Sequence, residues 1–140
     1  MVLYAEDIMR KNGEMLDENV SALKASVVMS EKHNGYVIVG SNNIPKGIVT
    51  EWDFINKVVS KNLNPEKVKL KEIMTSPLTY VKPDTPMDRV ADLMANKGIR
   101  RLLVIDNDKL TGIITSRDVL KYFREYVMDV VEIASKFGIR

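Results

Sequence analysis

The sequence contains no cysteine and only one histidine among its 140 residues, and both absences exclude chemistry. Without cysteine there is no disulfide, no thiolate nucleophile and no sulfur ligand for a metal, which fits a reducing compartment. A structural zinc site draws its ligands mainly from cysteine and histidine. We therefore predict no metal site.

Long apolar runs are missing as well. No stretch approaches the ~20 apolar residues that a membrane helix needs, and the N-terminus lacks a basic segment followed by an apolar one. We expect a cytoplasmic protein that makes no membrane contact. The formal net charge of +2 is too small to predict nucleic-acid binding by itself, and the hydrophobic content of 45% suits one globular core.

Catalytic and common nucleotide-binding motifs are also absent. The segment Gly35 to Gly40 has the glycine spacing of a Walker sequence, but Ser41 and Asn42 follow where Lys and then Ser or Thr are required. No nucleophile is paired with a base in the sequence. We therefore predict that the protein is not an enzyme.

The chain is organised by a seven-residue pattern that occurs twice. Gly47-Ile-Val-Thr-Glu-Trp-Asp53 returns 65 residues later as Gly112-Ile-Ile-Thr-Ser-Arg-Asp118. The same shift aligns residues 8–53 with residues 73–118 without a gap, so the protein is an internal duplication. Each copy closes an apolar run and opens a helical pattern. A Thr hydroxyl, free N–H groups and a carboxylate at such a position suit a small polar ligand.

These motifs resemble a tandem pair of cystathionine-β-synthase (CBS) domains, a unit called a Bateman module. The family signature is Gly-h-h-Thr/Ser-x-x-Asp/Asn, where h is apolar, and both copies satisfy it. Other segments typical of the family stand in place: Asp7-Ile8-Met9, Glu72-Ile73-Met74-Thr75 and Gly98 to Asp106. The resemblance covers essentially the whole chain.

Hydrophobic periodicity predicts a short helix and then strand, helix, strand, strand and helix in each half. In the first half we expect helices around 4–9, over 19–32 with Asn19 as N-cap, and from Thr50 to about Pro65, with strands at 15–16, 36–39 and 44–50. In the second half we expect helices over 71–75, over 85–96 with Pro86 in the first turn, and from 116 onward, with strands at 78–81, 101–106 and 110–115.

Each repeat has helices for only one face of its small sheet, so the halves must bury the other faces against each other. We predict an α+β fold with mixed α/β content, made of two β-α-β-β-α repeats. The expected boundaries are 1–66 for the first repeat and 67–140 for the second, which has an extended C-terminal helix. The resemblance implies pseudo-two-fold pairing with two related clefts between the repeats.

In the CBS family these clefts bind adenine nucleotides, which implies ligand roles for the matching residues. Asp53 and Asp118 would accept hydrogen bonds from ribose hydroxyls. Thr50 and Thr115 would contact phosphate beside helix N-termini. A single Thr-x-x-Asp sequence is more often a helix cap, and each pair could cap and bind at once.

Phosphate also needs positive charge, which the second half supplies. Arg100 and Arg101 stand where the family often has basic phosphate contacts, and Arg117 lies inside the second signature. Because successive strand side chains face opposite ways, we expect one of the adjacent arginines to point to solvent and at least one to face the cleft. The matching positions of the first half carry no formal charge: Gly35, Tyr36 and Trp52. We therefore expect unequal clefts.

Adenine would need an apolar slot with backbone amides along its edge. Candidates by family position are Thr79, Val81 and Ile99, with Ile113 behind them, although such residues are often simply part of the core. The lone His33 lies near the cleft, but a lone histidine is more often a surface or capping residue than a ligand contact.

The C-terminal helix carries an apolar seam of coiled-coil type. Its members recur at spacings of four and three residues: Val119, Phe123, Tyr126, Val130, Ile133 and Phe137. The first half of this helix must cover the sheet, whereas no segment of the chain is predicted to cover the part beyond Tyr126. We predict a homodimer, with packing against the first helix as the alternative.

The function predicted from these residues is a sensor that binds AMP, with ADP or ATP as competitors, and signals occupancy to an unidentified partner protein. No obligatory cofactor is expected. The alternative is a nucleic-acid-binding or structural interaction module that uses Lys67, Lys69 and Lys71 of the connector and the region of Arg100 and Arg101. Alternating lysines of this kind are more typical of a solvated linker, and a steep salt dependence of RNA or DNA binding would favour the alternative.

Overall fold

Two three-stranded sheets form the centre of the protein, in a computed structural model that describes residues 2–11 and 14–138. The first sheet has the order β1-β2-β3 and the second the order β4-β5-β6. In each sheet the first pair of strands is parallel and the second antiparallel. The strand bounds are β1 Met15–Leu16, β2 Tyr36–Ser41, β3 Ile44–Thr50, β4 Tyr80–Val81, β5 Arg101–Asp106 and β6 Lys109–Thr115.

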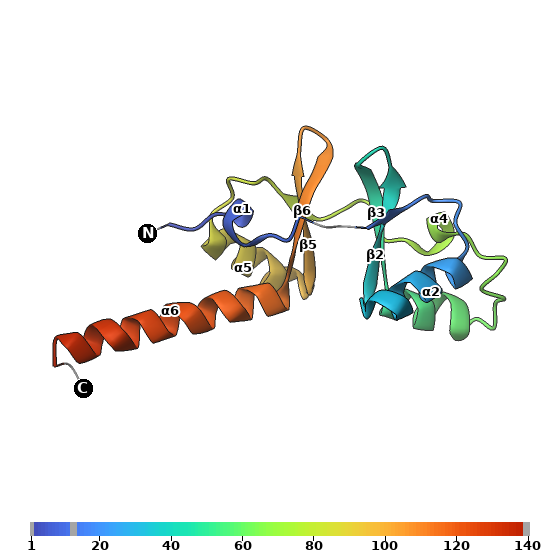
Figure 1. Ribbon diagram of the computed structural model, residues 1–140. Coiled ribbons are helices and arrows are strands. Elements are labelled where there is room, and N and C mark those ends of the chain that lie inside the picture. Colours follow the sequence, from blue (N-terminus) through green and yellow to red (C-terminus); the bar gives the residue numbers. More distant parts are fainter. Residues whose placement is uncertain (1, 12–13, 139–140) are drawn as a thin grey trace.

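Short helices surround the sheets, and each sheet together with the helices packed on it is called a lobe. One long helix projects from the second lobe, which contains β4, β5 and β6 (Figure 1). Alternation of helices and strands in each half gives the predicted α+β class. The helix bounds are α1 Ala5–Ile8, α2 Ala22–Lys32, α3 Glu51–Phe54, the π-helix η1 Ile55–Val59, α4 Leu70–Ile73, α5 Met87–Lys97 and α6 Ser116–Lys136.

The duplication is preserved in the strand register. Tyr36 pairs with Thr50 in the first sheet, and Arg101 pairs with Thr115 at the equivalent place in the second. Both antiparallel pairs also contain one register irregularity, after Val39 and after Val104. The 65-residue shift seen in the sequence therefore relates the two backbones as well.

Two helix starts differ from the predicted ones. Helix α2 begins after Ser21, whose hydroxyl accepts the Lys24 N–H at 3.1 Å. Asn19 lies in a turn instead, where its N–H donates to the Asp17 carboxylate at 2.8 Å. Pro86 is the N-cap of α5 rather than part of its first turn, because its ψ of 147° is extended. Because Asp17 holds Asn19 in a turn, α2 begins two residues later than predicted.

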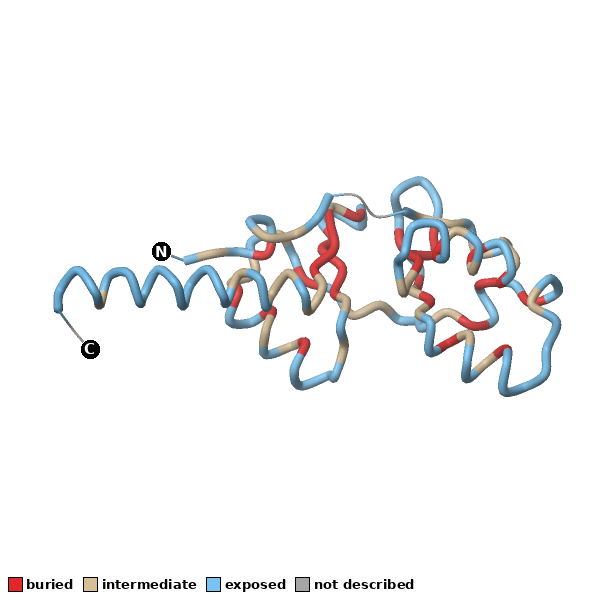
Figure 2. The backbone as a smooth tube through the Cα atoms, turned by 60° about the horizontal axis from the view of Figure 1, so that its bottom comes forward, coloured by how far each residue is buried: buried red, intermediate tan, exposed pale blue. Residues whose placement is uncertain are grey.

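Each sheet buries both of its faces, because alternate side chains of a strand point in opposite directions. In β2, Val37 and Val39 face the helices of their own lobe, whereas Ile38 faces the other sheet. In β5, Leu102 and Leu103 divide in the same way. Buried residues therefore gather in the strands, with others on the helices that cover the sheets (Figure 2). The predicted burial of each half against the other is confirmed by one shared cluster: Ile38, Leu103, Ile105, Leu110 and Ile113.

The short helices α1 and α4 cross over between the lobes. Helix α1 belongs to the first repeat in sequence but packs in the second lobe, where the Ala5 N–H donates to the Thr85 carbonyl at 2.8 Å. Helix α4 follows the connector and packs in the first lobe, where the Ala22 N–H donates to the Val68 carbonyl at 2.7 Å. The repeat boundary at residues 66 and 67 stays a prediction, and each lobe combines segments from both sides of it.

Only the beginning of α6 is packed against the lobe. Val119 and Tyr122 contact the second core, whereas Phe123 and Tyr126 are 60% and 55% exposed. Figure 2 shows an exposed backbone along the outer part of this helix. Among the described residues, no helix combines the length and the apolar character that crossing a bilayer requires.

Candidate functional site

Both signature threonines and aspartates form capping boxes at the start of a helix. Oδ2 of Asp118 accepts the N–H and the hydroxyl of Thr115, each at 2.9 Å. Oδ2 of Asp53 accepts the same two groups of Thr50 at 2.8 and 3.3 Å. The cap occupies one carboxylate oxygen in each pair, so only Oδ1 is left for another partner.

In the first repeat this second oxygen is taken. Oδ1 of Asp53 lies 3.0 Å from Nζ of Lys57, and the same ammonium donates to the Ile73 carbonyl at 2.8 Å. The side chain of Asp53 is only 7% exposed. A ligand hydroxyl would have to displace an ion pair whose carboxylate is nearly buried, and this cost disfavours ligand binding at the first signature.

In the second repeat Oδ1 of Asp118 is held by an exposed partner. Arg10 donates to it through Nε at 2.9 Å and lies 2.8 Å away through a terminal nitrogen, with a side chain that is 56% exposed. Burial raises the pKa of Asp118, but hydrogen bonds from Thr115 and Arg10 and the charge of Arg10 outweigh burial and lower it. The carboxylate is ionised at neutral pH and can change partners.

A basic cavity of about 210 Å³ lies beside this pair. Its positive side chains come from the N-terminal segment, from the start of β5 and from the first turn of α6. The hydroxyl of Ser116 adds a donor at the N-terminus of a 21-residue helix, where an anion is favoured, whereas the Thr115 hydroxyl donates to Asp118 within the cap. The lining residues are Arg10, His33, Asn34, Gly35, Tyr36, Arg100, Arg101, Thr115, Ser116 and Arg117.

A second cavity, of about 630 Å³, adjoins the first. Arg10 and Arg117 line both, so the two spaces share a wall. Leu3, Ile8 and Tyr122 give this cavity an apolar side, and the carboxylate of Asp118 lies on it. The two cavities together thus place a cationic, hydrogen-bonding surface next to a partly apolar one.

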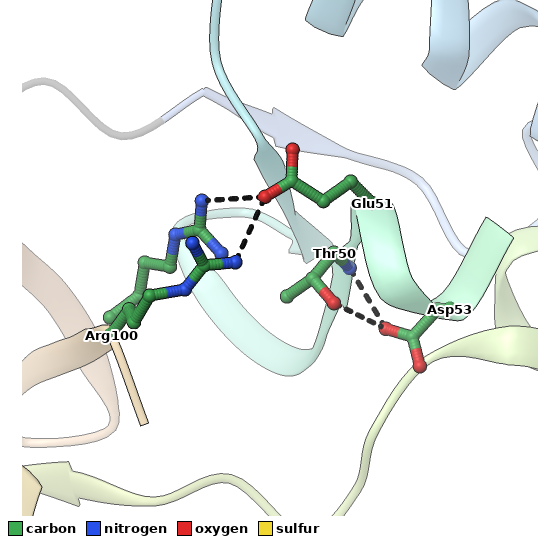
Figure 3. Close-up of polar contacts among 5 residues, drawn as sticks. Thr50, Glu51, Asp53 and Arg100 are labelled. Atoms are coloured by element: carbon green, nitrogen blue, oxygen red, sulfur yellow. Dashed lines mark hydrogen bonds and ion pairs between the residues drawn. The ribbon is translucent and has the colours of Figure 1, made fainter. Parts of the chain in front are cut away.

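One carboxylate from the first repeat holds both adjacent arginines. Glu51 Oε1 lies 3.0 Å from Arg100 and 3.4 Å from Arg101 (Figure 3). We expected one of these arginines to point to solvent and at least one to face the cleft: Arg100 is indeed largely exposed, yet both arginines line the cavity. Strand β5 begins only at Arg101, so strand alternation does not govern Arg100, whose long side chain reaches across. Arg101 is 16% exposed and Arg100 63%.

Tyr36 completes the wall from the first repeat. The guanidinium of Arg101 stands 5.5 Å from the centre of its ring, within the range of a cation–π contact. Burial raises the pKa of the Tyr36 phenol, and the charges of Arg10 and Arg101 only partly oppose this rise. The phenol is therefore neutral and can donate a hydrogen bond into the cavity.

The residues expected to contact adenine lie elsewhere. Val81 and Ile113 are buried in the core clusters, and Ile99 packs against one of them. Thr79 is half-buried and lines neither cavity. The sequence reasoning missed the apolar wall because Leu3, just before α1, and Ile8, at its end, cross over with this helix into the second lobe.

The glycine of each signature has a packing reason. A Cβ at Gly112 would lie 2.5 Å from Sδ of Met9, and a Cβ at Gly47 would lie 2.7 Å from Sδ of Met74. These methionines end the short helices that cross between the lobes. The signature glycine therefore lets α1 or α4 approach the strand that leads into Thr115 or Thr50.

Two repeats packed face to face over a basic cleft define a small regulatory module. The CBS domain family matches residues 5–60 and 70–125, so the chain belongs to this family and carries two CBS domains in tandem. An uncharacterized protein of Methanopyrus kandleri is 41% identical over 102 residues, 72% of this chain and 52% of that protein. The chain spans about half or less of the first curated relatives it matches, at 52%, 24% and 47% of their lengths. Relatives named as enzymes are matched over only 23% or 24% of their length.

Solved structures agree with this assignment. A hexameric CBS-CP12 protein from bloom-forming cyanobacteria has a TM-score of 0.78 and 33% identity, covering 99% of this chain and 86% of that one. The CBS domain pair of protein MJ0100, in complex with 5′-methylthioadenosine and S-adenosyl-L-methionine, has a TM-score of 0.80 and 26% identity, covering 90% and 99%.

Proposed function

We propose that the protein is a non-enzymatic sensor that binds an adenine nucleotide at its second signature and signals occupancy to a partner protein. The observation that carries this proposal is the pair of adjoining cavities around Thr115 and Asp118, one basic and one partly apolar. AMP is the expected ligand, with ADP and ATP as competitors. The adenosine ligands named for the MJ0100 pair support an adenosine-containing ligand.

The larger cavity suits the nucleoside. A flat purine gains by burial against Leu3, Ile8 and Tyr122, and Oδ1 of Asp118 can accept from the ribose hydroxyls. The carboxylate is already ionised and already fixed by its cap through Oδ2. Ribose binding therefore requires only that the ion pair between Asp118 and Arg10 be broken.

The smaller cavity suits the phosphate. Arg10 becomes free once ribose takes its carboxylate, and it lines the same space as Arg100, Arg101 and Arg117. The Ser116 hydroxyl and the N-terminus of α6 add neutral donors. The phosphate would compete with Glu51 for the two adjacent arginines.

This competition supplies a route for signalling. The contact between Glu51 and the arginines joins the first repeat to the second, and the phosphate would replace it. Occupancy then changes how the repeats are tied together at the cleft. A partner that contacts both repeats can distinguish the two states by its differential affinity for them.

Calorimetric titration with AMP, ADP, ATP and adenosine tests the proposal. We expect Arg101→Ala to weaken the binding of all three nucleotides about tenfold or more, because a hydrogen bond to a charged group contributes about 1.5–3 kcal/mol. Adenosine binding should change little. Arg89→Ala is the matched control, because Arg89 is exposed and lines neither cavity. Failure of the intact protein to bind any of these four ligands at millimolar concentration would refute the sensor.

A further inference from the structure

The outer part of α6, together with its C-cap Phe137, presents a continuous apolar seam to solvent. Tyr126, Val130, Ile133 and Phe137 are 55%, 47%, 55% and 76% exposed. Of the residues that the structure describes, those packed against α6 meet it near Val119 and Tyr122, before this seam begins. Figure 1 shows the outer turns of the helix projecting away from both lobes. A seam of this size on a water-exposed helix indicates an interaction surface.

We propose that this seam pairs with the same seam of a second copy of the chain, with the two helices antiparallel. Its four members are spaced four, three and four residues apart, as in a coiled coil. In one antiparallel register Tyr126 lies against Phe137 of the second copy, and Val130 against its Ile133. Every member then has a partner, and the arrangement has the two-fold symmetry of a closed dimer.

Charge complementarity selects this register. Asp129 and Lys136 flank the seam on the same side, one heptad apart. The antiparallel register places Asp129 beside Lys136 of the second copy, and symmetry repeats the pair. In a parallel pairing Asp129 would face Ala134, with no ion pair. The seam alone does not choose between directions, but these charges do.

A longer antiparallel overlap is disfavoured. Moving the second copy one heptad toward the lobe would bring the two Asp129 side chains together. It would also require Val119, which is already packed in the core of its own lobe. In the proposed register Phe137 of the second copy stops opposite Tyr126, beyond Tyr122, the last packed residue. The free length of the helix therefore matches the overlap.

The interface would be small. An aromatic side chain can bury about 150–250 Å² and aliphatic ones less, so the exposed parts of the four seam residues from both copies amount to nearly 1,000 Å². This area is at the lower limit for a specific interface. We therefore expect a dimer that dissociates on dilution through the micromolar range, with no requirement for nucleotide.

Sedimentation velocity of the full chain, without nucleotide, tests the surface. Ile133→Lys should raise the dimer dissociation constant at least tenfold and leave the circular dichroism spectrum unchanged. Met128→Lys is the matched control, because Met128 is 62% exposed but lies outside the seam. A wild-type chain that stays monomeric up to high micromolar concentration overturns the proposal, as does equal weakening by both variants.

Two further variants test the direction. Asp129→Lys should weaken the dimer, and adding Lys136→Asp to it should restore affinity. Because the chain has no cysteine, engineered thiols report contacts directly. A mixture of Tyr126→Cys and Phe137→Cys chains should form a mixed disulfide dimer on oxidation, whereas Tyr126→Cys alone should not. Cross-linking of Tyr126→Cys with itself would indicate parallel helices and refute the register.

Discussion

Replacing Glu51 by glutamine should make the protein bind nucleotides more tightly. The Glu51 carboxylate is the counter-ion of Arg100 and Arg101 in the structure, at 3.0 and 3.4 Å. A phosphate in the basic cavity must displace it, and its negative charge also repels the ligand. Glutamine keeps the size and the hydrogen-bonding oxygen but removes the charge.

The size of the effect follows from the exposure of the ion pairs. The Glu51 side chain is 52% exposed, and exposed ion pairs contribute about 0.2–1 kcal/mol each. Two such pairs therefore oppose phosphate binding by about 1 kcal/mol, which corresponds to roughly fivefold in affinity. The gain should be larger for ATP than for AMP because ATP carries more charge, and it should shrink at high salt.

Calorimetric titration of AMP, ATP and adenosine into the wild type and Glu51→Gln measures this gain. Adenosine should bind both proteins equally, because it carries no phosphate. Glu31→Gln, at an exposed position that lines neither cavity, controls for the general loss of one negative charge. Weaker AMP binding by Glu51→Gln would show that Glu51 helps to build the site, and the competition argument would fail.

Four other outcomes are expected. Asp118→Asn should weaken AMP binding about tenfold or more, whereas Asp53→Asn should keep the tighter binding event, because Asp53 already pairs with Lys57; equal losses in calorimetry would contradict unequal clefts. The pKa of Asp118 is lowered on folding, so its stabilising effect is present above the ordinary aspartate pKa of about 3.9 and is lost as pH falls through the lowered pKa. In urea unfolding, the difference in unfolding free energy between wild type and Asp118→Asn should therefore narrow from pH 7 to pH 3. Gly112→Ala should lower the unfolding free energy by about 1–3 kcal/mol, because the added methyl overpacks against Met9; an unchanged melting temperature would refute this. Ending the chain after Tyr126 should leave a folded monomer in light scattering, and an unchanged particle mass would exclude the α6 seam from self-association.

The order of elements was predictable because both repeats carry strong local signals. Gly47 and Gly112 mark equivalent points of the strands that lead into the signature helices, and these strands are short and rich in β-branched residues. The predicted start of α2 was wrong because Asn19 is held in a turn by Asp17, and Ser21 caps the helix instead. Asn and Ser are both good capping residues, so residue type alone could not rank Asn19 against Ser21.

The candidate site was predictable only in part. Thr115, Arg100, Arg101 and Arg117 do line one cavity, as the motif suggested. Arg10 and Glu51 were missed because their importance depends on contacts across the lobes. Arg10 directly follows the family-typical segment Asp7-Ile8-Met9. A basic residue at this place was the one signal in the sequence that could have marked Arg10 as part of the site. The apolar wall from α1 could not be inferred without knowing that this helix crosses over.

The crossing of α1 and α4 has a consequence for how the chain is made. During synthesis the first lobe lacks its last helix until α4 leaves the ribosome, soon after the connector. Helix α1 and Arg10 are made before the second lobe, yet their hydrogen bonds to Thr85 and Ile113 are complete only once β6 has been made. This segment therefore docks after the strands of the second lobe have been synthesised. These contacts join residues far apart in sequence and therefore carry a large loop-closure cost, which makes docking of α1 a candidate for the slow step of folding.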